Sequence, residues 1–192
     1  MLSAGPRSVA AMVQSIELLL DERAEDALRA AWSALADAGL PSLATHPGDS
    51  NRPHVTVAVT EGAGFPAAAG ALRAVFEGWG LAVNGLAAVV GAPVLFGGHR
   101  HRWVLARQLV PSRPLLTLHA AVHRALRLDA PDAAVIEQTL PDRWTPHLSL
   151  ARRMPAERLG EALTLLDPEP LPCRIAGARL WDSVAKTVVP LA

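Results

Sequence analysis

One six-residue pattern occurs twice in this chain and restricts its fold more than any other feature. Residues 53–58 read Pro-His-Val-Thr-Val-Ala and residues 146–151 read Pro-His-Leu-Ser-Leu-Ala, which places the two histidines 93 positions apart. Polar and apolar residues alternate in both copies, and this period of two is typical of a strand with one buried face. The repeat therefore predicts two similar strands that come from distant parts of the chain.

Side chains at positions i and i+2 of a strand point to the same face. His54 and Thr56 are therefore expected to project together, as are His147 and Ser149. The apolar residues between them are expected to point the other way, into a core. If the two strands meet in one sheet, two imidazoles and two hydroxyls surround one cleft.

The segments around the repeat predict further strands and helices. Asp21 is an expected N-cap, because its side-chain oxygens can accept a hydrogen bond from the first turn of a helix, and Ser112 and Pro114 are expected to start another helix. The expected strands cover residues 12–20, 54–60, 81–90, 94–96, 101–109 and 147–152, then a hairpin of 175–181 and 183–189, and the expected helices cover 22–38, 66–79, 112–128 and 155–166. Helices mixed with antiparallel hairpins indicate an α+β fold. We expect one domain over residues 12–192, after a flexible tail at residues 1–11.

Length and charge limit the class of protein. The chain has 192 residues, of which 51% are hydrophobic, so it can bury a sizeable core and is not expected to be disordered. Its 18 basic and 18 acidic residues cancel, which argues against nucleic-acid binding by bulk charge but allows a small basic site for one phosphate. Cys173 has no cysteine partner, and no apolar run reaches the ~18 residues of a membrane span. We therefore expect a soluble, cytoplasmic protein.

Two histidines and two hydroxyls on one cleft suit phosphodiester chemistry without a metal. Because the usual histidine pKa is near ~6.5, one neutral imidazole can take a proton while a second, protonated imidazole gives one. The hydroxyls of Thr56 and Ser149 can donate hydrogen bonds to the phosphate oxygens. Arg152 could add a charged donor, but its odd offset from His147 places it on the opposite face of a regular strand. Only a bulge or the strand end would return it to the histidine face.

The segments His54-Val-Thr56 and His147-Leu-Ser149 resemble the paired signatures of the two-histidine (2H) phosphoesterase superfamily. Within it, the chain is most similar to the family of 2′-5′ RNA ligases and cyclic phosphodiesterases. The resemblance implies a two-lobed α+β fold with pseudo-twofold symmetry, antiparallel sheets lining a central cleft and helices outside. It also implies that His54 and His147 are the acid–base pair, and that Thr56, Ser149 and Arg152 bind phosphate. Ser149 stands where threonine is more common, which keeps the hydroxyl.

The resemblance further implies an activity. Such a protein opens 2′,3′-cyclic phosphates or 2′-5′ phosphodiesters at the ends of RNA or nucleotides, and some members join RNA ends in the reverse direction. Members of the family need no metal and no nucleotide cofactor. Apart from the resemblance, the sequence gives no indication of a membrane or of an obligate protein partner. Our preferred assignment makes His54 the acid for the leaving group and His147 the base for water, but the symmetry of the two motifs leaves this assignment open.

Other residues support further interpretations. Trp144, His101 and Trp103 are candidate substrate contacts, whereas Trp32 falls in the apolar pattern of a helix and is expected in the core. One alternative is an inactive module that binds RNA or nucleotides on the same fold. A second is a metallohydrolase that uses the four remaining motif-like histidines, which are His99, His101, His119 and His123. His119 and His123 have the i, i+4 spacing of metal ligands, but the segment between them lacks the glutamate of zinc proteases.

Overall fold

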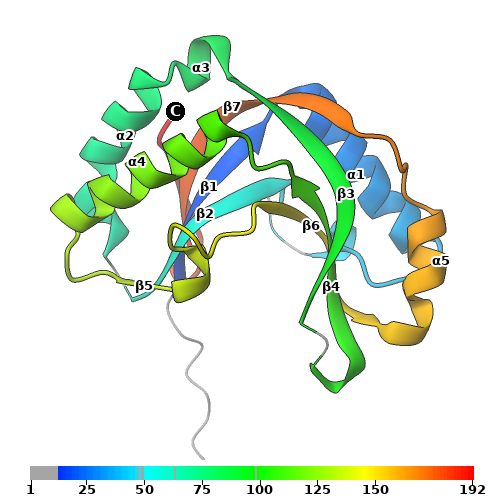
Figure 1. Cartoon of the computed structure of the whole chain (residues 1–192). Coiled ribbons are helices and arrows are strands. Elements are labelled where there is room, and N and C mark those ends of the chain that lie inside the picture. Colours follow the sequence, from blue (N-terminus) through cyan, green and yellow to red (C-terminus); the bar gives the residue numbers. More distant parts are fainter. Residues whose placement is uncertain (1–12, 47, 49, 63, 98) are drawn as a thin grey trace, which may run out of the picture.

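The fold was analysed in a computed structural model that describes residues 13–46, 48, 50–62, 64–97 and 99–192. The tail expected at residues 1–11 lies outside the described residues. In the described part, helices and antiparallel strands are mixed, which confirms the expected α+β class (Figure 1).

Eight strands form one sheet in which every pairing is antiparallel. The strands are β1 (Val13–Leu20), β2 (His54–Glu61), β3 (Leu86–Gly97), β4 (Arg102–Leu109), β5 (Ala134–Val135), β6 (His147–Pro155), β7 (Leu171–Asp182) and β8 (Thr187–Pro190). The α-helices are α1 (Glu22–Asp37), α2 (Ala69–Gly78), α3 (Leu81–Asn84), α4 (Arg113–Asp129) and α5 (Leu159–Thr164). Five 3₁₀ turns complete the described elements: Leu43–Thr45, Phe65–Ala68, His99–His101, Glu137–Thr139 and Ala156–Arg158.

The sheet divides into two lobes that are joined at two places. β1, β2, β5 and β8 form one lobe, and β3, β4 and β6 form the other. The long strand β7 belongs to both, because Leu171–Ile175 pairs with β3 and the following residues pair with β1. The second junction is a single bridge between β2 and β6, where Val55 pairs with Leu148. The two copies of the repeated motif therefore meet where the lobes meet.

The helices cover the two lobes separately. Figure 1 shows α2 and α4 beside the lobe of β1 and β2, and α1 and α5 beside the lobe of β3 and β4. The expected cap at Asp21 is present, since its side chain accepts a hydrogen bond from Ala24 N, and Ser112 at the expected start of α4 accepts one from Leu115 N. The apolar faces of α1 and α4 then bury Trp32 and Leu118 in the core, so the expected core position of Trp32 is confirmed.

Two expectations for residues 81–96 are wrong. Leu81–Asn84 is a helical turn and not the start of a strand, because Gly80 and Gly85 on either side adopt left-handed φ angles of 62° and 61°. β3 then runs without a break to Gly97, although two strands were expected there. A shift of register between Val90 and Pro93 accommodates the proline, which lacks the N–H that a regular ladder needs.

Within the described residues, no helix is both long enough and apolar enough to cross a membrane.

Candidate active site

The bridge between β2 and β6 brings the two motifs together. Val55 and Leu148 pair in antiparallel register and are both buried. Their neighbours His54, Thr56, His147 and Ser149 therefore share the opposite face of the sheet, and all four are half-buried. We call this surface the motif face. The antiparallel bridge places His54 on the side of Ser149 and Thr56 on the side of His147, with the two histidines as diagonal neighbours.

Both imidazoles are oriented in the same way. The Nδ1 atom of His54 lies 2.8 Å from the carbonyl oxygen of Arg52, and that of His147 lies 2.7 Å from the carbonyl oxygen of Thr145. A carbonyl oxygen only accepts, so each Nδ1 carries the proton. This leaves the Nε2 atom of each ring for a ligand. The two motifs thus repeat an orienting contact as well as a sequence.

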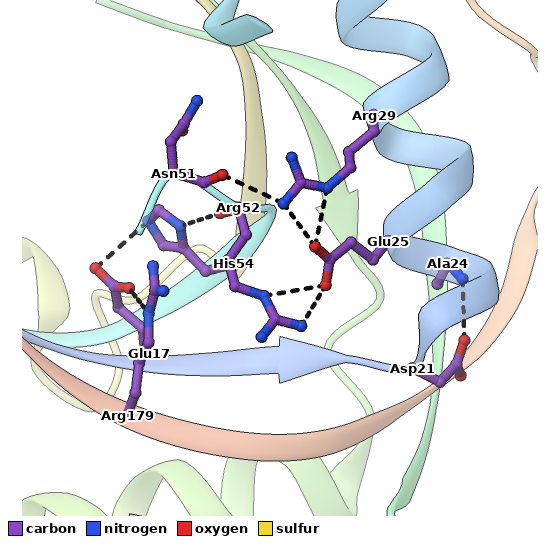
Figure 2. A network of polar contacts seen from close by, with 9 residues as sticks. All are labelled: Glu17, Asp21, Ala24, Glu25, Arg29, Asn51, Arg52, His54 and Arg179. Carbon is purple, nitrogen blue, oxygen red and sulfur yellow. Dashed lines mark hydrogen bonds and ion pairs between the residues drawn. The ribbon is translucent and has the colours of Figure 1, made fainter. Parts of the chain in front are cut away.

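The Nε2 atom of His54 faces a buried carboxylate. Glu17 on β1 places its Oε1 atom 3.6 Å from this nitrogen (Figure 2). Ser15 donates a hydrogen bond of 2.7 Å to Oε1, and Arg179 on β7 donates one of 2.7 Å to Oε2. Glu17 and Arg179 are 3% and 6% exposed. The pair fixes a negative charge beside the nitrogen that must carry a proton if His54 is an acid.

The backbone that orients His54 is tied to helix α1. Arg52 forms an ion pair with Glu25, and Arg29 donates hydrogen bonds to Glu25 and to the carbonyl oxygen of Asn51 (Figure 2). These contacts hold the segment before His54 against the first turns of the helix. They therefore fix the carbonyl group that accepts the Nδ1–H of His54.

The surroundings of His147 differ from those of His54. Phe96 on β3 packs on the imidazole with ring centroids 4.4 Å apart. Burial lowers the pKa of His147 below its usual value, and the charges of His54 and Arg152 lower it further, against the opposing effect of the bond to Thr145. His147 is therefore neutral at neutral pH, which is the state of a base.

A bulge in β6 brings Arg152 to the motif face. Ser149 pairs with Ala106 and Ala151 pairs with Leu105, so Leu150 is an extra residue between two adjacent partners. Leu150 and Ala151 are accordingly both buried, and Arg152 and Arg153 after them are both exposed, next to a second register shift between Leu105 and Trp103. The charge of Arg152 also acts on His147. The bulge that Arg152 needs in order to lie on the histidine face is therefore present in β6.

Two tryptophans support the motif strands where β2 and β6 separate. Trp32 donates its indole N–H to the carbonyl oxygen of Ser149 (3.1 Å), and Trp144 donates to that of Thr56 (2.8 Å). One face of Trp144 is stacked on His119, with ring centroids 4.0 Å apart and an interplanar angle of 5°. The face of the indole that lies on His119 is therefore not available to a base.

His119 and His123 support the fold behind β2. Their Nε2 atoms lie 2.9 Å from Thr139 O and 3.2 Å from Val57 O, and both rings are buried. Burial lowers the pKa of both, that of His119 to about 4. Among the described residues, no group of three or more histidine, cysteine, aspartate or glutamate side chains could hold a metal ion.

We expect this histidine pair to make folding sensitive to acid. The unfolded chain binds protons below pH ~6.5, whereas buried His119 does so only near pH 4. The free energy of unfolding should be unaffected above pH 6.5 and should fall, by up to roughly 3 kcal/mol, as the pH drops to 4. Denaturant titrations across this range measure the loss. His119→Phe keeps a ring against Trp144 but cannot titrate, so an equal loss in that variant would contradict the assignment.

The remaining candidate contacts lie apart from the motif face. Trp103 is on the opposite face of β4 from Ala106, the partner of Ser149, and packs against the core. It is therefore not part of the candidate site. His101 is exposed in the turn before β4, at the far end of that strand from Gln108, the partner of His147.

A groove of about 1000 Å³ also lies elsewhere, between the start of α1 and strands β3 and β7. Its lining includes Cys173, and burial raises the pKa of this thiol to about 11. None of the four motif side chains lines it.

Sequence reasoning missed three residues of the site. Glu17 could have been found, because Ser15 and Glu17 are polar residues at i and i+2 in a strand whose other residues after Gln14 are apolar. Phe96 and Arg179 carry no such signal. Phe96 reaches His147, and Arg179 reaches Glu17, only because the sheet places β3 and β7 one strand away from the motif strands.

Comparisons with known proteins give the fold. Neither the protein-family models nor the curated proteins contain a match to this chain. Among solved structures, Kluyveromyces marxianus Usb1 with uridine monophosphate superposes with a TM-score of 0.52 and 15% identity, over 94% of this chain and 98% of that one. Escherichia coli LigT complexed with 3′-AMP superposes with a TM-score of 0.51 and 14% identity, over 95% of each chain. Both have the two-histidine phosphoesterase fold, so the fold implied by the paired motifs is confirmed.

Proposed function

Because this chain has the two-histidine phosphoesterase fold, we propose that it is a metal-independent phosphodiesterase. Its substrate is a 2′,3′-cyclic phosphate or a 2′-5′ phosphodiester at the end of an RNA or a nucleotide. The observation that carries the proposal is the shared face of the two motifs, with His54, Thr56, His147 and Ser149 on both sides of one bridge. The nucleotides bound to the two solved structures of this fold support a nucleotide or RNA ligand.

The proposed reaction assigns one proton transfer to each histidine. His147, which is neutral, takes a proton from water through Nε2 as the water oxygen attacks phosphorus. His54, which faces the carboxylate of Glu17, gives its Nε2 proton to the ribose oxygen as the P–O bond breaks. The products are a phosphomonoester and a free hydroxyl. Water supplies one proton and the leaving oxygen receives one, so the two histidines exchange their protonation states in one turnover.

The two hydroxyls and Arg152 hold the phosphate during this reaction. Thr56 and Ser149 can each donate a hydrogen bond to a non-bridging oxygen, where charge accumulates in the transition state. The guanidinium of Arg152 adds a charged donor on the same face. In the ligation direction a ribose hydroxyl replaces water, and each histidine performs the reverse transfer.

The decisive assay offers the purified protein all four 2′,3′-cyclic nucleotides and a short RNA with a cyclic phosphate end. Reactions are run with a strong chelator present, and the products are separated by chromatography. We expect opening of the cyclic phosphate at an undiminished rate in the chelator. Binding without turnover would favour the inactive module, and activity that is lost on chelation and restored by a metal would favour the metallohydrolase.

The lowered pKa of His147 predicts the acidic side of the pH profile. Because His147 must be neutral to act as the base, kcat/KM should fall only below the usual histidine value of ~6.5. Phe96→Ala exposes the imidazole and should move this limb toward ~6.5. The measurement is kcat/KM against pH for both proteins. A limb that stays in place in the variant would show that Phe96 does not shield His147.

A further inference from the structure

Charge is distributed unevenly around the motif face, although the whole chain is neutral. Between Glu77 and Asp129 the sequence has six arginines and no aspartate or glutamate. Between Asp142 and Glu157 it has three arginines and again no acid. The first stretch contains β3, β4 and most of α4, with three of its six arginines in α4 and three in β4 or the turn before it, and the second contains β6. The adjacent strands β4 and β6 therefore carry positive charge with no carboxylate of their own.

Four of these arginines lie together beyond the phosphate end of the motif. Arg152 and Arg153 follow the bulge in β6, and Arg102 begins β4 opposite Pro155. The guanidinium of Arg102 lies 3.5 Å from the carbonyl oxygen of Arg153, and Arg100 stands in the turn before β4. All four are exposed. The turn joins β3 and β4, whose hairpin extends to the lower edge of the fold in Figure 1.

These arginines differ from those that support the fold. Arg29, Arg52 and Arg179 are each paired with a glutamate. Within the described part of the chain, no ion pair is formed by Arg100, Arg102, Arg152 or Arg153. Four exposed guanidinium groups without carboxylates leave their charge available to an external anion.

We propose that Arg100, Arg102 and Arg153 form a strip that binds the phosphodiester backbone of an RNA chain whose end lies at the two histidines. The inference rests on the proposed function and narrows it, because it makes an oligonucleotide, and not a mononucleotide, the preferred substrate. Arg102 and Ala106 share the motif face, and the four intervening steps along β4 span ~13 Å. A single nucleotide held by its phosphate at Ser149 is too short to use the whole strip.

The chemistry favours RNA over an acidic protein as the occupant. The strip continues directly from Arg152, so one RNA strand could place its terminal phosphate at the two histidines and its following phosphates along the strip. A nucleic-acid strand carries a phosphate at every step, and the planar fork of arginine suits phosphate oxygens. A carboxylate-rich peptide has no group for the two histidines to act on.

The test compares substrate lengths in the full chain. One substrate is a 2′,3′-cyclic mononucleotide, and the other is an oligouridylate of about eight nucleotides with a cyclic phosphate end, a length within ordinary single-strand sites. The variant R100N/R153N removes two guanidinium groups of the strip. Asparagine is chosen because it tolerates the left-handed φ angles of 51° and 59° at these positions. R102Q tests the strip at a third point. The control R73Q/R124Q removes two exposed arginines from α2 and α4, outside the strip.

For R100N/R153N we expect kcat/KM on the oligomer to fall on the order of tenfold at low salt, while kcat/KM on the mononucleotide is unchanged. The slope of log kcat/KM against log salt, measured from about 50 to about 200 mM, should become shallower by about 1.4 for two lost phosphate contacts. R102Q should show a smaller loss of the same kind. R73Q/R124Q should behave as the wild type.

Binding of a 5′-labelled, 3′-phosphorylated oligouridylate, followed by fluorescence anisotropy, separates the two proposals. If the wild type turns over neither substrate, the proposed function fails, and weaker binding by R100N/R153N still identifies the strip as an RNA surface. Three results would each contradict RNA binding by the strip and leave the phosphodiesterase proposal unaffected. These are unchanged oligomer binding by R100N/R153N, equal losses of kcat/KM on both substrates, and competition by polyglutamate as strong as that by RNA.

Discussion

Replacing either His54 or His147 with alanine is expected to lower kcat by ~10²–10⁴-fold or more, because each imidazole carries one proton transfer of the proposed reaction. Each imidazole is half-buried and, among the described residues, bonds only one backbone carbonyl group, which belongs to a residue that is not changed, so each variant should remain folded. The measurement is steady-state hydrolysis of a 2′,3′-cyclic nucleotide, with thermal unfolding as the check on folding. Turnover that is unchanged in either variant would remove that histidine from the mechanism.

The two variants should differ in which substrate they still accept. A nitrophenyl phosphodiester has a leaving group that departs without a proton, so it does not need the acid. H54A should therefore retain much more of its activity on this substrate than H147A does. Equal losses, or the reverse order, would contradict the assignment of His54 as the acid. If added imidazole partly restores the activity of H147A, the variant lacks a base. A displaced phosphate site would not be repaired in this way.

Replacing Arg179 with methionine is expected to lower the free energy of unfolding by about 3–5 kcal/mol. The carboxylate of Glu17 is buried, and the substitution removes the guanidinium that compensates its charge. Equilibrium denaturation in urea at neutral pH measures the change. The exposed pair Arg158–Glu161 offers the control, because R158M removes a solvent-screened contact and should cost less than about 1 kcal/mol.

The double variant E17Q/R179M separates charge from packing. Glutamine can still accept the hydrogen bond from Ser15 but leaves no unpaired charge, so much of the stability lost in R179M should return. If the double variant is as unstable as the sum of the two single variants, the buried charge is not the cause. E17Q, alone or combined with R179M, should also lower kcat on substrates that need the acid, since the charge beside His54 is gone.

Local patterns in the sequence predicted most of the elements that carry the site. The alternation around each histidine predicted β2 and β6, and Asp21 and Ser112 predicted the starts of α1 and α4. These features depend on residues within a few positions of one another. The prediction was wrong at Leu81–Asn84, where two glycines with left-handed φ angles allow a helical turn that apolar periodicity does not reveal.

Arg152 marks the limit of this kind of reasoning within a single strand. Its distance from His147 along the sequence places it on the wrong face of a regular strand. The face is decided by the extra residue Leu150, which has no distinct sequence signal and becomes a bulge only through the register with β4.

By itself, the sequence determined that two histidine–hydroxyl strands exist and which side chains share a face in each, because a period of two is a property of the local backbone. Only the tertiary structure decided that the strands meet at Val55 and Leu148, and how the two equivalent histidines become different. His54 lies beside Glu17 and His147 beneath Phe96, since β1 and β3 bring these groups from distant positions. Desolvation and charge depend on which atoms are close in space, and that information is absent from two nearly identical motifs.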